Sequence, residues 1–577
     1  MNASPALAPS DLDLCAAARQ AIGPSYVRPE NGPARVAAYW EGKMKLPPHP
    51  EWKNADVTDW MADPFSDRNW QFQHHTLRWL NPLRWAALDG DERARTEWLR
   101  VARSWFEANV PAKIARAAFA WKDMADGNRA INLSLGASLV GAEDDWFMEL
   151  LAAHRDWLMD ETHIVGKNHG LHQHAGLFVV GAVLRDEAAM DTATRRMTEQ
   201  FVTAFDEQGC NDEGSAAYHQ MNLRWWSQSW QRVETEGRQL PDVVTSRLLA
   251  ASSVLAHLGL PSGRMPQIGD SSRGAVMEGS GAESDFVATR GQSGTRPKGL
   301  VNVLDGGYVL SRSGWGEDRP IEQESHMLIR HGIELKAHSH FDRGSVHIYA
   351  AGTPWLVDSG FYNYGRGEPI RQHLQSRQAH NVAMLRGASH DDAASVTLER
   401  AVVTDEAHDF VVVDHGYETA VVTRRVIFLT GPDCWIVWDT TDSQEHPLIH
   451  QWHTEPGLSA QRHDRGFRLR SGSTTLHLSW LGRPPTLRRR KAAENDYRGW
   501  IGTRWKTLEP GSLITAEATQ DSHGLALLIA PSHDTPLGIV DSYVTLKGAL
   551  TATLTRGRTT WSLRIEDEVS IQEVTGN

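Results

Sequence analysis

Two polar residues stand directly before an apolar stretch in the segment KNHGLHQHAG, Lys167–Gly176. Asn168 can cap a helix with its side chain, or its amide can donate a hydrogen bond to an anion. His169 can accept a proton, because imidazole titrates near neutral pH. The pair is therefore either a helix start or an anion site with a neighbouring base.

A second cluster, NDEGSAAYHQ, occupies residues 211–220. Asp212 and Glu213 precede a glycine, and Tyr218 with His219 follows one helical turn later. A tyrosine at the mouth of a helical domain can donate or accept a proton. The structural alternative is a buried tyrosine with a satisfied hydroxyl group.

The third cluster lies in KAHSHFDRGSVHIYAAGTPWLVDSGFYNYG, residues 336–365. His338 and His340 are separated by one residue, so on an extended strand both side chains point to the same face. Asp358 ends the next hydrophobic run, and His380 follows in RQAHN. Two imidazoles and one carboxylate from adjacent strands form a plausible zinc site with one open position.

The elements that carry these residues change character along the chain. From about Asn69 to Leu258 the pattern is helical, and two apolar sets follow the spacing i, i+3, i+4, i+7 or close to it. They are Trp98, Val101, Ala102 and Trp105, with candidate caps Asp89 and Asp91, and Met197, Phe201, Ala204 and Phe205, with a candidate stop at Gly209. Further helices are expected at Ala130–Val140, His174–Leu184 and Pro241–Leu258.

From about Leu300 the pattern is that of β-strands, with short β-branched or alternating runs between turn residues. The runs lie at 306–315, 325–332, 345–360, 409–417, 424–441, 474–482, 524–531 and 559–569. Strands that follow helices indicate segregated layers or separate domains, not a parallel α/β sheet. The joint is expected within Glu278–Pro297, which is rich in Gly and Ser.

Composition limits the class of protein. The 577 residues include 59 Lys and Arg and 72 Asp and Glu, so the net charge is −13, which argues against a nucleic-acid binder. Three distant cysteines, Cys15, Cys210 and Cys434, form no disulfide framework. No run is apolar and long enough for a membrane span. The N-terminus lacks a secretory leader, so a cytoplasmic location is expected, or the periplasm and cell envelope if a leader was removed.

Together the clusters resemble the heparinase II/III superfamily of polysaccharide lyases. The residues that carry the resemblance cover roughly Trp70 to Trp480 and lie in six places: Asn168–His169, Tyr218 in EGSAAYHQ, Pro266–Gly274 (PQIGDSSRG), His338–Ser345 (HSHFDRGS), Val357–Gly365 (VDSGFYNYG) and His380–Leu385 (HNVAML). The resemblance implies an α+β multidomain chain, in which an incomplete (α/α) toroid precedes an antiparallel β-sandwich. The expected divisions are an N-terminal arm or helical extension at 1–68, the toroid at 69–277, a linker at 278–299 and the sandwich at 300–577.

Lyases of this kind cleave the bond to C4 of a uronic acid by β-elimination and leave a 4,5-unsaturated end. The resemblance implies that Asn168 neutralises the carboxylate with help from His169, which is also the base for one C5 epimer. Tyr218 transfers the proton to the leaving oxygen, and also acts as base in one version of the mechanism. His338 is a further catalytic residue, and Tyr364 and Arg371 hold the sugar.

The family's metal pattern falls on His340, Asp358 and His380. The expected ion is divalent, most simply Zn²⁺, and structural, because elimination has no need of a metal-bound water nucleophile. Two imidazole ligands exclude an oxygen-only calcium site.

Other readings of the function remain open. A toroid glycoside hydrolase would use two carboxylates, and Asp212 and Glu213 are available, but they are adjacent and point differently. A non-catalytic glycan-binding or exopolysaccharide-assembly protein would also use the 23 Trp, but has no need of the Asn–His, Tyr and HxH sets.

The expected partner is an acidic polysaccharide, such as a glycosaminoglycan, alginate or an exopolysaccharide. Oligomeric state is open, a homodimer included. Sulfate recognition would need an array of basic residues, for which the candidates are Arg366, Arg371, Arg377 and Arg488–Arg490.

Overall fold

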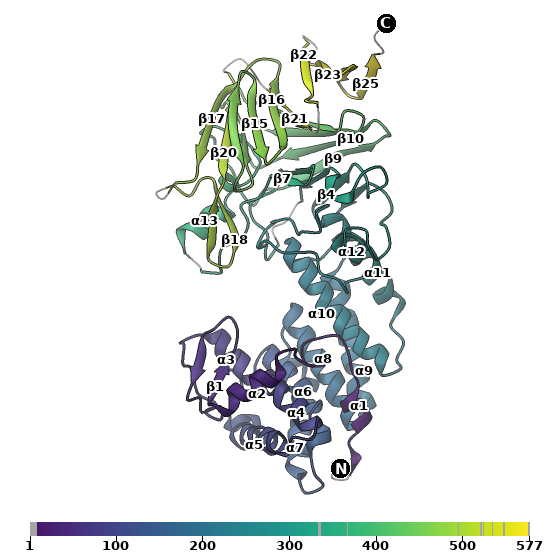
Figure 1. Cartoon of the computed structure of the whole chain (residues 1–577), viewed down its shortest axis with the longest axis vertical. Helices are drawn as coiled ribbons and strands as arrows, with labels where there is room; N and C mark the ends of the chain where they lie inside the picture. Colours follow the sequence, from purple (N-terminus) through teal and green to yellow (C-terminus); the bar gives the residue numbers. More distant parts are fainter. Residues whose placement is uncertain are drawn as a thin grey trace. The chain divides into compact units, whose positions relative to one another are not determined.

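The computed structural model describes residues 9–332, 336–365, 367–493, 496–519, 522, 524–532, 535–545 and 548–574. The chain forms two compact units (Figure 1). The first comprises residues 1–204 and 224–246, and the second comprises residues 205–223 and 247–577. The predicted order of the fold, helices first and antiparallel strands after them, is confirmed.

The first unit is helical. Its helices are α1 (Leu14–Ala18), α2 (Gly32–Trp40), α3 (Arg68–His75), α4 (Asn81–Leu88), α5 (Glu92–Asn109), α6 (Met124–Ser134), α7 (Asp145–Met159), α8 (Lys167–Leu184), α9 (Glu187–Ala204) and the later part of α10 (Ala216–Thr235), with a small hairpin of β1 (Lys43–Lys45) and β2 (Glu51–Lys53). The N-terminal extension predicted at 1–68 contains α1, α2 and this hairpin.

Local signals explain most of the helix boundaries. Asp91 caps α5, because its carboxylate accepts a hydrogen bond from the Ala94 amide at 3.0 Å. Two predicted boundaries are wrong. Helix α6 ends at Ser134 and a short 3₁₀ turn follows it, and α9 ends at Ala204, five residues before Gly209. In each case the chain leaves the helix before the apolar pattern ends, because the following residues pack in loops.

Helix α8 is the centre of the first unit. Every residue from Gln173 to Leu184 is buried, because the helix packs against α6, α7 and α9. It crosses α6 closely: a Cβ atom on Gly127 would lie 2.1 Å from the His172 carbonyl oxygen, so only glycine fits there. No helix in the described part of the chain is both long and apolar enough to cross a membrane.

The second unit consists mainly of antiparallel sheets. The largest has the order β14-β15-β16-β21-β12-β11-β10-β9, and the others are β17-β20-β13-β8, β3-β4-β5-β6-β7, β22-β23-β24-β25 and the hairpin β18-β19. The strands that matter below are β4 (Tyr308–Arg312), β5 (His326–Arg330), β6 (Val346–Ala350), β7 (Thr353–Leu356), β8 (Ala383–Leu385), β11 (Val422–Leu429), β12 (Cys434–Thr441), β13 (Leu448–His453), β17 (Thr486–Lys491) and β20 (Ser512–Glu517). Each strand run expected from the sequence overlaps at least one of these or of β10 (Ala407–Asp414), β16 (Thr474–Leu481), β21 (Gly524–Ser532) and β24 (Thr559–Ile565).

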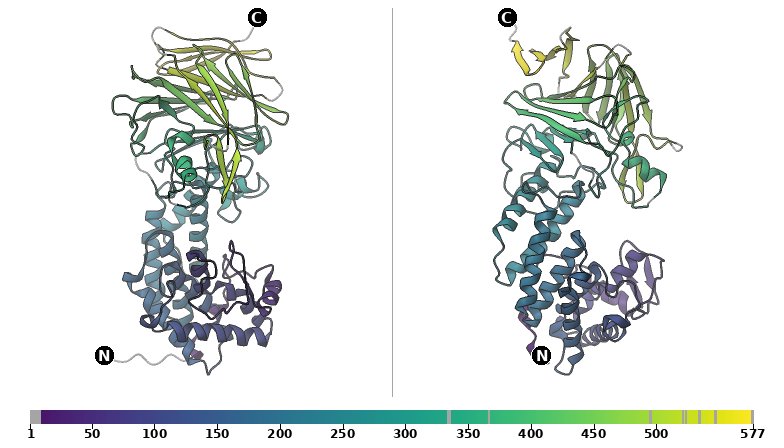
Figure 2. Two further views of the ribbon diagram at one scale, coloured as in Figure 1. Left: turned by 90° about the vertical axis from the view of Figure 1, so that its left-hand side faces the viewer. Right: turned by 180° about the vertical axis from the view of Figure 1, so that it is seen from behind.

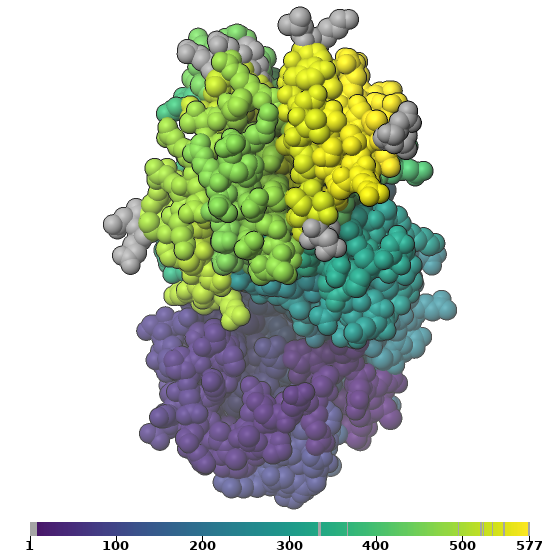
Figure 3. All heavy atoms as spheres, turned by 45° about the horizontal axis from the view of Figure 1, so that its top comes forward, coloured from purple at the N-terminus to yellow at the C-terminus, as the bar shows by residue number. Residues whose placement is uncertain are grey.

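Two hydrophobic cores hold the sheets together. The larger includes Trp355, Phe410, Trp452 and Trp480 and lies between the large sheet and its neighbours. The smaller lies on the opposite face of β11 and β12 and includes Leu550 and Trp561 of the C-terminal sheet. Figure 2 shows the long strands of this unit from two further sides, and in Figure 3 the C-terminal strands form a separate block beside them.

Part of the helical sequence packs with the strands. Arg312 of β4 is fully buried and donates hydrogen bonds to the carbonyl oxygens of Ala256 and Gly259, at the end of α11 (Asp242–Leu258). These contacts join α11 to the sheet, because a buried guanidinium group needs acceptors. The segment 278–299, predicted as a linker, contains the short helix α12 (Ala282–Ala288).

A buried ion pair ties loops of the second unit to the large sheet. The Arg424 guanidinium group contacts both carboxylate oxygens of Asp439, at 2.8 and 2.7 Å, and both side chains are almost fully buried. The same guanidinium group donates 2.6 Å hydrogen bonds to the carbonyl oxygens of Gly344 and Asn381. Arg424 therefore fixes two loops that carry the metal-site candidates.

We expect Arg424→Met to lower the free energy of unfolding by about 3–5 kcal/mol, because the buried Asp439 carboxylate then loses its guanidinium partner and keeps only the His450 imidazole, 2.7 Å away. Chemical denaturation measures this loss. The matched control is Arg564→Met, whose partner Glu566 forms an exposed pair at the surface, and we expect it to change the unfolding free energy by less than about 0.5 kcal/mol. Equal effects of the two variants would contradict the assigned role of Arg424.

Candidate functional site

The residues proposed from the sequence fall in both units. Tyr218, His338, Tyr364 and Arg371 lie in the second unit, and the structure brings all four side chains into one cluster. His340, Asp358 and His380 lie in the same unit and also come together. Asn168 and His169 belong to the first unit.

Three loops of the second unit meet where the cluster forms. The Asp270 amide donates to the His338 carbonyl oxygen, and the His338 amide donates to the Glu213 carbonyl oxygen, both at 2.9 Å. Gly269 has φ +59°, and a Cβ atom there would lie 2.4 Å from the His338 carbonyl oxygen. Only glycine fits this close approach. The backbone therefore places residues 213, 270 and 338 side by side although they are far apart in sequence.

Tyr218, near the start of α10, is the centre of the cluster. Its ring stacks on the His338 imidazole, with ring centroids 3.5 Å apart and planes 11° apart. Its hydroxyl group forms a 2.6 Å hydrogen bond with the hydroxyl group of Tyr364. Burial raises the pKa of Tyr218 well above its usual range, and the bond to Tyr364 raises it further. The phenol is therefore protonated at neutral pH.

Asp270 is a candidate site residue to which the sequence motifs assigned no role. Its buried carboxylate lies 3.0 Å from His338 Nδ1, 3.2 Å from His340 Nε2, and 3.3 and 3.4 Å from the two Nη atoms of Arg371. Burial alone would raise the pKa of Asp270, but the hydrogen bonds of the two imidazoles lower it well below its usual range. The sequence signal that could have identified Asp270 is its place in the motif PQIGDSSRG.

The expected strand through His338 and His340 is wrong. Residues 336–345 form turns ahead of β6, and no strand includes either histidine. The backbone is irregular here because it bonds to the loops of Glu213 and Asp270 instead of to a neighbouring strand. The two side chains nevertheless point toward the same carboxylate group.

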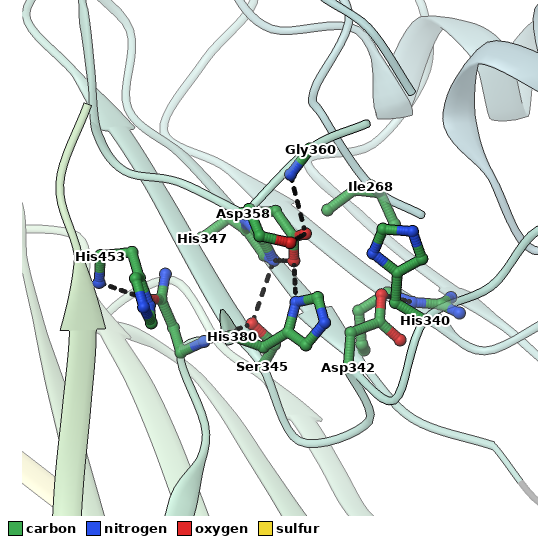
Figure 4. Close-up of polar contacts among 12 residues, drawn as sticks. Ile268, His340, Asp342, Ser345, His347, Asp358, Gly360, His380 and His453 are labelled. Atoms are coloured by element: carbon green, nitrogen blue, oxygen red, sulfur yellow. Dashed lines mark hydrogen bonds and ion pairs between the residues drawn. The ribbon is translucent and has the colours of Figure 1, made fainter. Parts of the chain in front are cut away.

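His340, Asp358 and His380 form a candidate metal centre (Figure 4). All three are buried, and each offers a ligand atom within 4.8 Å of the others. His340 Nδ1 and His380 Nε2 are buried and have no hydrogen-bond partner among the described residues. The other nitrogen of each ring contacts a carboxylate, Asp270 at 3.2 Å and Asp358 at 2.9 Å. Metal-binding histidines usually engage their second ring nitrogen with a carboxylate outside the ligand set, and the contact of His340 with Asp270 has this form, so these residues fit a divalent ion.

Asn168 does not cap the helix. Helix α8 starts at Lys167, Gly166 occupies the cap position, and Asn168 lies within the first turn. The cap position therefore lies two residues before Asn168, and Lys167, the first residue of the helix, has a left-handed φ of +58°. Among the described residues no hydrogen-bond partner of the Asn168 amide is found, so the amide is available to a ligand.

His169 is oriented by a carboxylate that the sequence did not reveal. Its Nδ1 lies 2.5 Å from Oδ1 of Asp123, the residue before α6. Asp123 has φ 62° and ψ −163°, a conformation that non-glycine residues seldom adopt. With Nδ1 engaged, Nε2 is the nitrogen that remains for proton transfer.

The arginine array expected for sulfate is dispersed. Arg371 contacts Asp270, and Arg377 is buried and paired with Asp414 at 2.6 Å. Arg488 and Arg490 lie on β17, and Arg490 is paired with Asp496 at 2.8 Å. Arg366 lies outside the described residues.

Two family models match the sequence. Residues 40–281 match the model described as heparinase II/III N-terminus, and residues 295–495 match the model described as heparinase II/III-like, C-terminal. A search of curated protein sequences finds no match.

Solved structures share the fold over nearly the whole chain. Heparan sulfate lyase HepC from Pedobacter heparinus has a TM-score of 0.75 at 16% identity, covering 96% of this chain and 92% of that one. The BT4657 gene product, a heparinase III, has a TM-score of 0.77 at 15% identity, covering 98% and 93%. A further structure described as heparinase III has a TM-score of 0.72 at 16% identity, covering 99% and 94%. At these identities the likeness shows the fold.

We expect the purified protein to carry a divalent ion, most simply zinc, at His340, Asp358 and His380. Elemental analysis of chelator-free protein measures it. His340→Ala should remove the ion and lower the melting temperature, because binding to the native state alone stabilises by roughly 4 kcal/mol at about a thousand times the dissociation constant.

The matched control is His415→Ala, since His415 is exposed and distant in sequence from the three ligands. It should keep both metal and melting temperature. Wild-type protein without metal would refute the site, and the three residues would then form a hydrogen-bonded network. Loss of turnover on chelation with no loss of stability would show that the ion is catalytic.

Proposed function

The chain belongs to the heparinase II/III superfamily, and from this we propose that it is a polysaccharide lyase that cleaves a uronic-acid polymer by β-elimination. The observation that carries the proposal is the cluster of Tyr218, His338 and Tyr364 around the Asp270 carboxylate. The names of the fold neighbours, heparan sulfate lyase and heparinase III, support a glycosaminoglycan as the substrate class.

Elimination places three demands on the protein. The C5 proton of the uronate is weakly acidic, so the neighbouring carboxylate must be neutralised to stabilise the charge that develops. A base must remove that proton. The bond from C4 to the glycosidic oxygen then breaks as the C4–C5 double bond forms, and an acid must protonate the departing oxygen.

Tyr218 is suited to be the acid. Its raised pKa keeps the hydroxyl group protonated, and Tyr364 and His338 hold it in place from two sides. His338 is itself fixed by Asp270, so the stacked pair has little freedom to rotate. We assign Tyr364 and Arg371 to sugar binding, since Tyr364 is largely exposed and Arg371 lies over its ring at 5.5 Å.

Asn168 and His169 supply the remaining two functions. The Asn168 amide is a neutral donor that can bind the uronate carboxylate without a charge of its own. Asp123 holds His169 through Nδ1, which leaves Nε2 as the base.

A metal ion at His340, Asp358 and His380 would neutralise the buried Asp358 carboxylate and join the loops before β6, after β7 and before β8. Because Asp270 contacts both His340 and His338, those loops hold His338 in position for Tyr218.

We expect the products to carry a 4,5-unsaturated uronate at the new non-reducing end. A panel of heparan sulfate, chondroitin, hyaluronan, alginate and bacterial exopolysaccharides, followed by ultraviolet absorbance, would identify the substrate. Products that contain oxygen from isotopically labelled water and show no new absorbance band would mean hydrolysis and would overturn the lyase proposal.

We expect Tyr218→Phe to reduce turnover by about 10²–10⁴-fold, the usual effect of losing a positioned acid. The fold should persist, because only one hydroxyl group is removed, and circular dichroism melting checks this. Tyr543→Phe, at an exposed position on β22 (Gly538–Val544), is the control and should behave as wild type. Normal turnover in a folded Tyr218→Phe protein would rule out the assigned role.

A further inference from the structure

We propose that the first unit contains a second carbohydrate site, a basic cavity that binds an acidic sugar residue of the polysaccharide away from the bond that is cleaved. The identity of this ligand rests on the function proposed above. The cavity has a volume of about 720 Å³ and lies among α2, the β1–β2 hairpin and the residues that lead into α4. We call it the basic cavity and define it by Arg35, Arg78, Tyr39, Trp79 and Lys45, which line it.

The charge of the basic cavity is unusual for a protein with a net charge of −13. Five basic side chains line it against two acidic ones, Glu30 and Glu51. Two of the basic residues have carboxylate partners: Arg28 contacts Asp89, and Lys43 contacts Glu41. Within the described part of the chain, neither Arg35 nor Arg78 forms an ion pair or a side-chain hydrogen bond, so both guanidinium groups are available to an anion.

Arg78 is held at the wall of the cavity by a strained backbone. The residue before it, Leu77, is buried and has a left-handed φ of +55°, which is uncommon for a bulky side chain. The Arg78 side chain is accessible to solvent, yet desolvation lowers its pKa, and the charge of Arg35 lowers it further. An anion bound in the cavity near Arg78 would offset the repulsion from the Arg35 charge.

The cavity also offers flat apolar surface. Tyr39 and Trp79 line it, and their rings stack with centroids 6.3 Å apart and planes 23° apart. The Trp79 indole donates a 2.9 Å hydrogen bond to the His74 carbonyl oxygen, which fixes the ring. Aromatic faces with a few convergent charged groups suit an acidic sugar ring better than a free inorganic anion, which has no apolar face to cover.

The basic cavity is linked to the helix that carries Asn168 and His169. His172 lies one turn after His169 on α8 and is half-buried. Desolvation, together with the charges of His169 and Arg78, lowers its pKa to about 4. Arg78 and His172 also line one smaller cavity together. Arg78 thus lines the basic cavity and also lies near His172, one turn from His169. A polymer chain bound at Asn168 and His169 would therefore lie near the basic cavity, in the same unit.

The test uses the full-length protein with Tyr218→Phe as the background, so that ligands are not cleaved. Calorimetry compares a heparin tetrasaccharide, a heparosan tetrasaccharide of the same backbone without sulfate, and inorganic sulfate. Arg78→Gln and Arg35→Gln should each weaken tetrasaccharide binding by about tenfold, equivalent to about 1.4 kcal/mol, and Trp79→Ala should weaken it as well. Arg103→Gln, at an exposed α5 position paired with Glu107 at 3.0 Å, is the control and should bind as wild type does.

A loss confined to the heparin tetrasaccharide would identify sulfate as the group bound, and an equal loss with both would identify the carboxylate. Inorganic sulfate that binds as tightly as the tetrasaccharides would overturn the proposal of a sugar site. The proposal would also be overturned if Arg78→Gln and Arg35→Gln both melted at the wild-type temperature and bound the tetrasaccharides as tightly as the wild type does.

Kinetics separates this proposal from the proposed function. In the active protein, which retains Tyr218, Arg78→Gln should raise KM by about tenfold and leave kcat nearly unchanged. The substitution removes a binding interaction that the ground state and the transition state share. If the wild type binds tetrasaccharides through these arginines but forms no unsaturated product, the lyase proposal fails and the basic cavity stands. If the wild type cleaves and the variants keep its KM and its affinity, the basic cavity fails alone.

Discussion

The candidate site of the second unit depends on one buried carboxylate. Asp270 is almost completely removed from solvent, and an ionised carboxylate at such a place needs charged or hydrogen-bonding partners. It has three: His338, His340 and Arg371. His338 and His340 come from one loop and Arg371 from the helix α13 (Pro369–Gln375), and the three have different proposed roles, in proton transfer, in metal binding and in sugar binding. A single electrostatic requirement therefore aligns residues that the reaction must use together.

The metal candidates extend this arrangement. Asp270 engages one nitrogen of His340, which leaves the other nitrogen buried and without a partner. Asp358 does the same for His380. Arg424 is buried and donates hydrogen bonds to the carbonyl oxygens of Gly344 and Asn381, in the loops that carry His340 and His380. Buried polar groups are normally satisfied, so the two remaining imidazole nitrogens favour a ligand that the protein binds from solution.

In the first unit the corresponding constraint is backbone strain. Asp123, Lys167 and Leu77 all have positive φ values although none is glycine. Each stands beside a residue with a proposed role or contacts one: Asp123 contacts His169, Lys167 precedes Asn168, and Leu77 precedes Arg78. Such conformations cost roughly 1–3 kcal/mol each and persist only where surrounding packing fixes them. The rigid packing of α8 against α6 provides that support.

The sequence by itself determined the succession of helices and antiparallel strands, because apolar periodicity is a local property that burial then satisfies. Motifs that resemble a known family also identified two sets of residues. The catalytic and sugar-binding candidates are Tyr218, His338, Tyr364 and Arg371, and the metal-ligand candidates are His340, Asp358 and His380. The sequence could not show that Asn168 lies inside its helix, that His338 and His340 occupy a turn, or that Asp123 and Asp270 orient the histidines. It also did not reveal the basic cavity of Arg35 and Arg78. These features depend on contacts between residues far apart in the chain, 68 positions for Asp270 and His338 and 146 for Tyr218 and Tyr364. Only the tertiary structure decides them, because the local pattern carries no information about which distant side chain will compensate a buried charge.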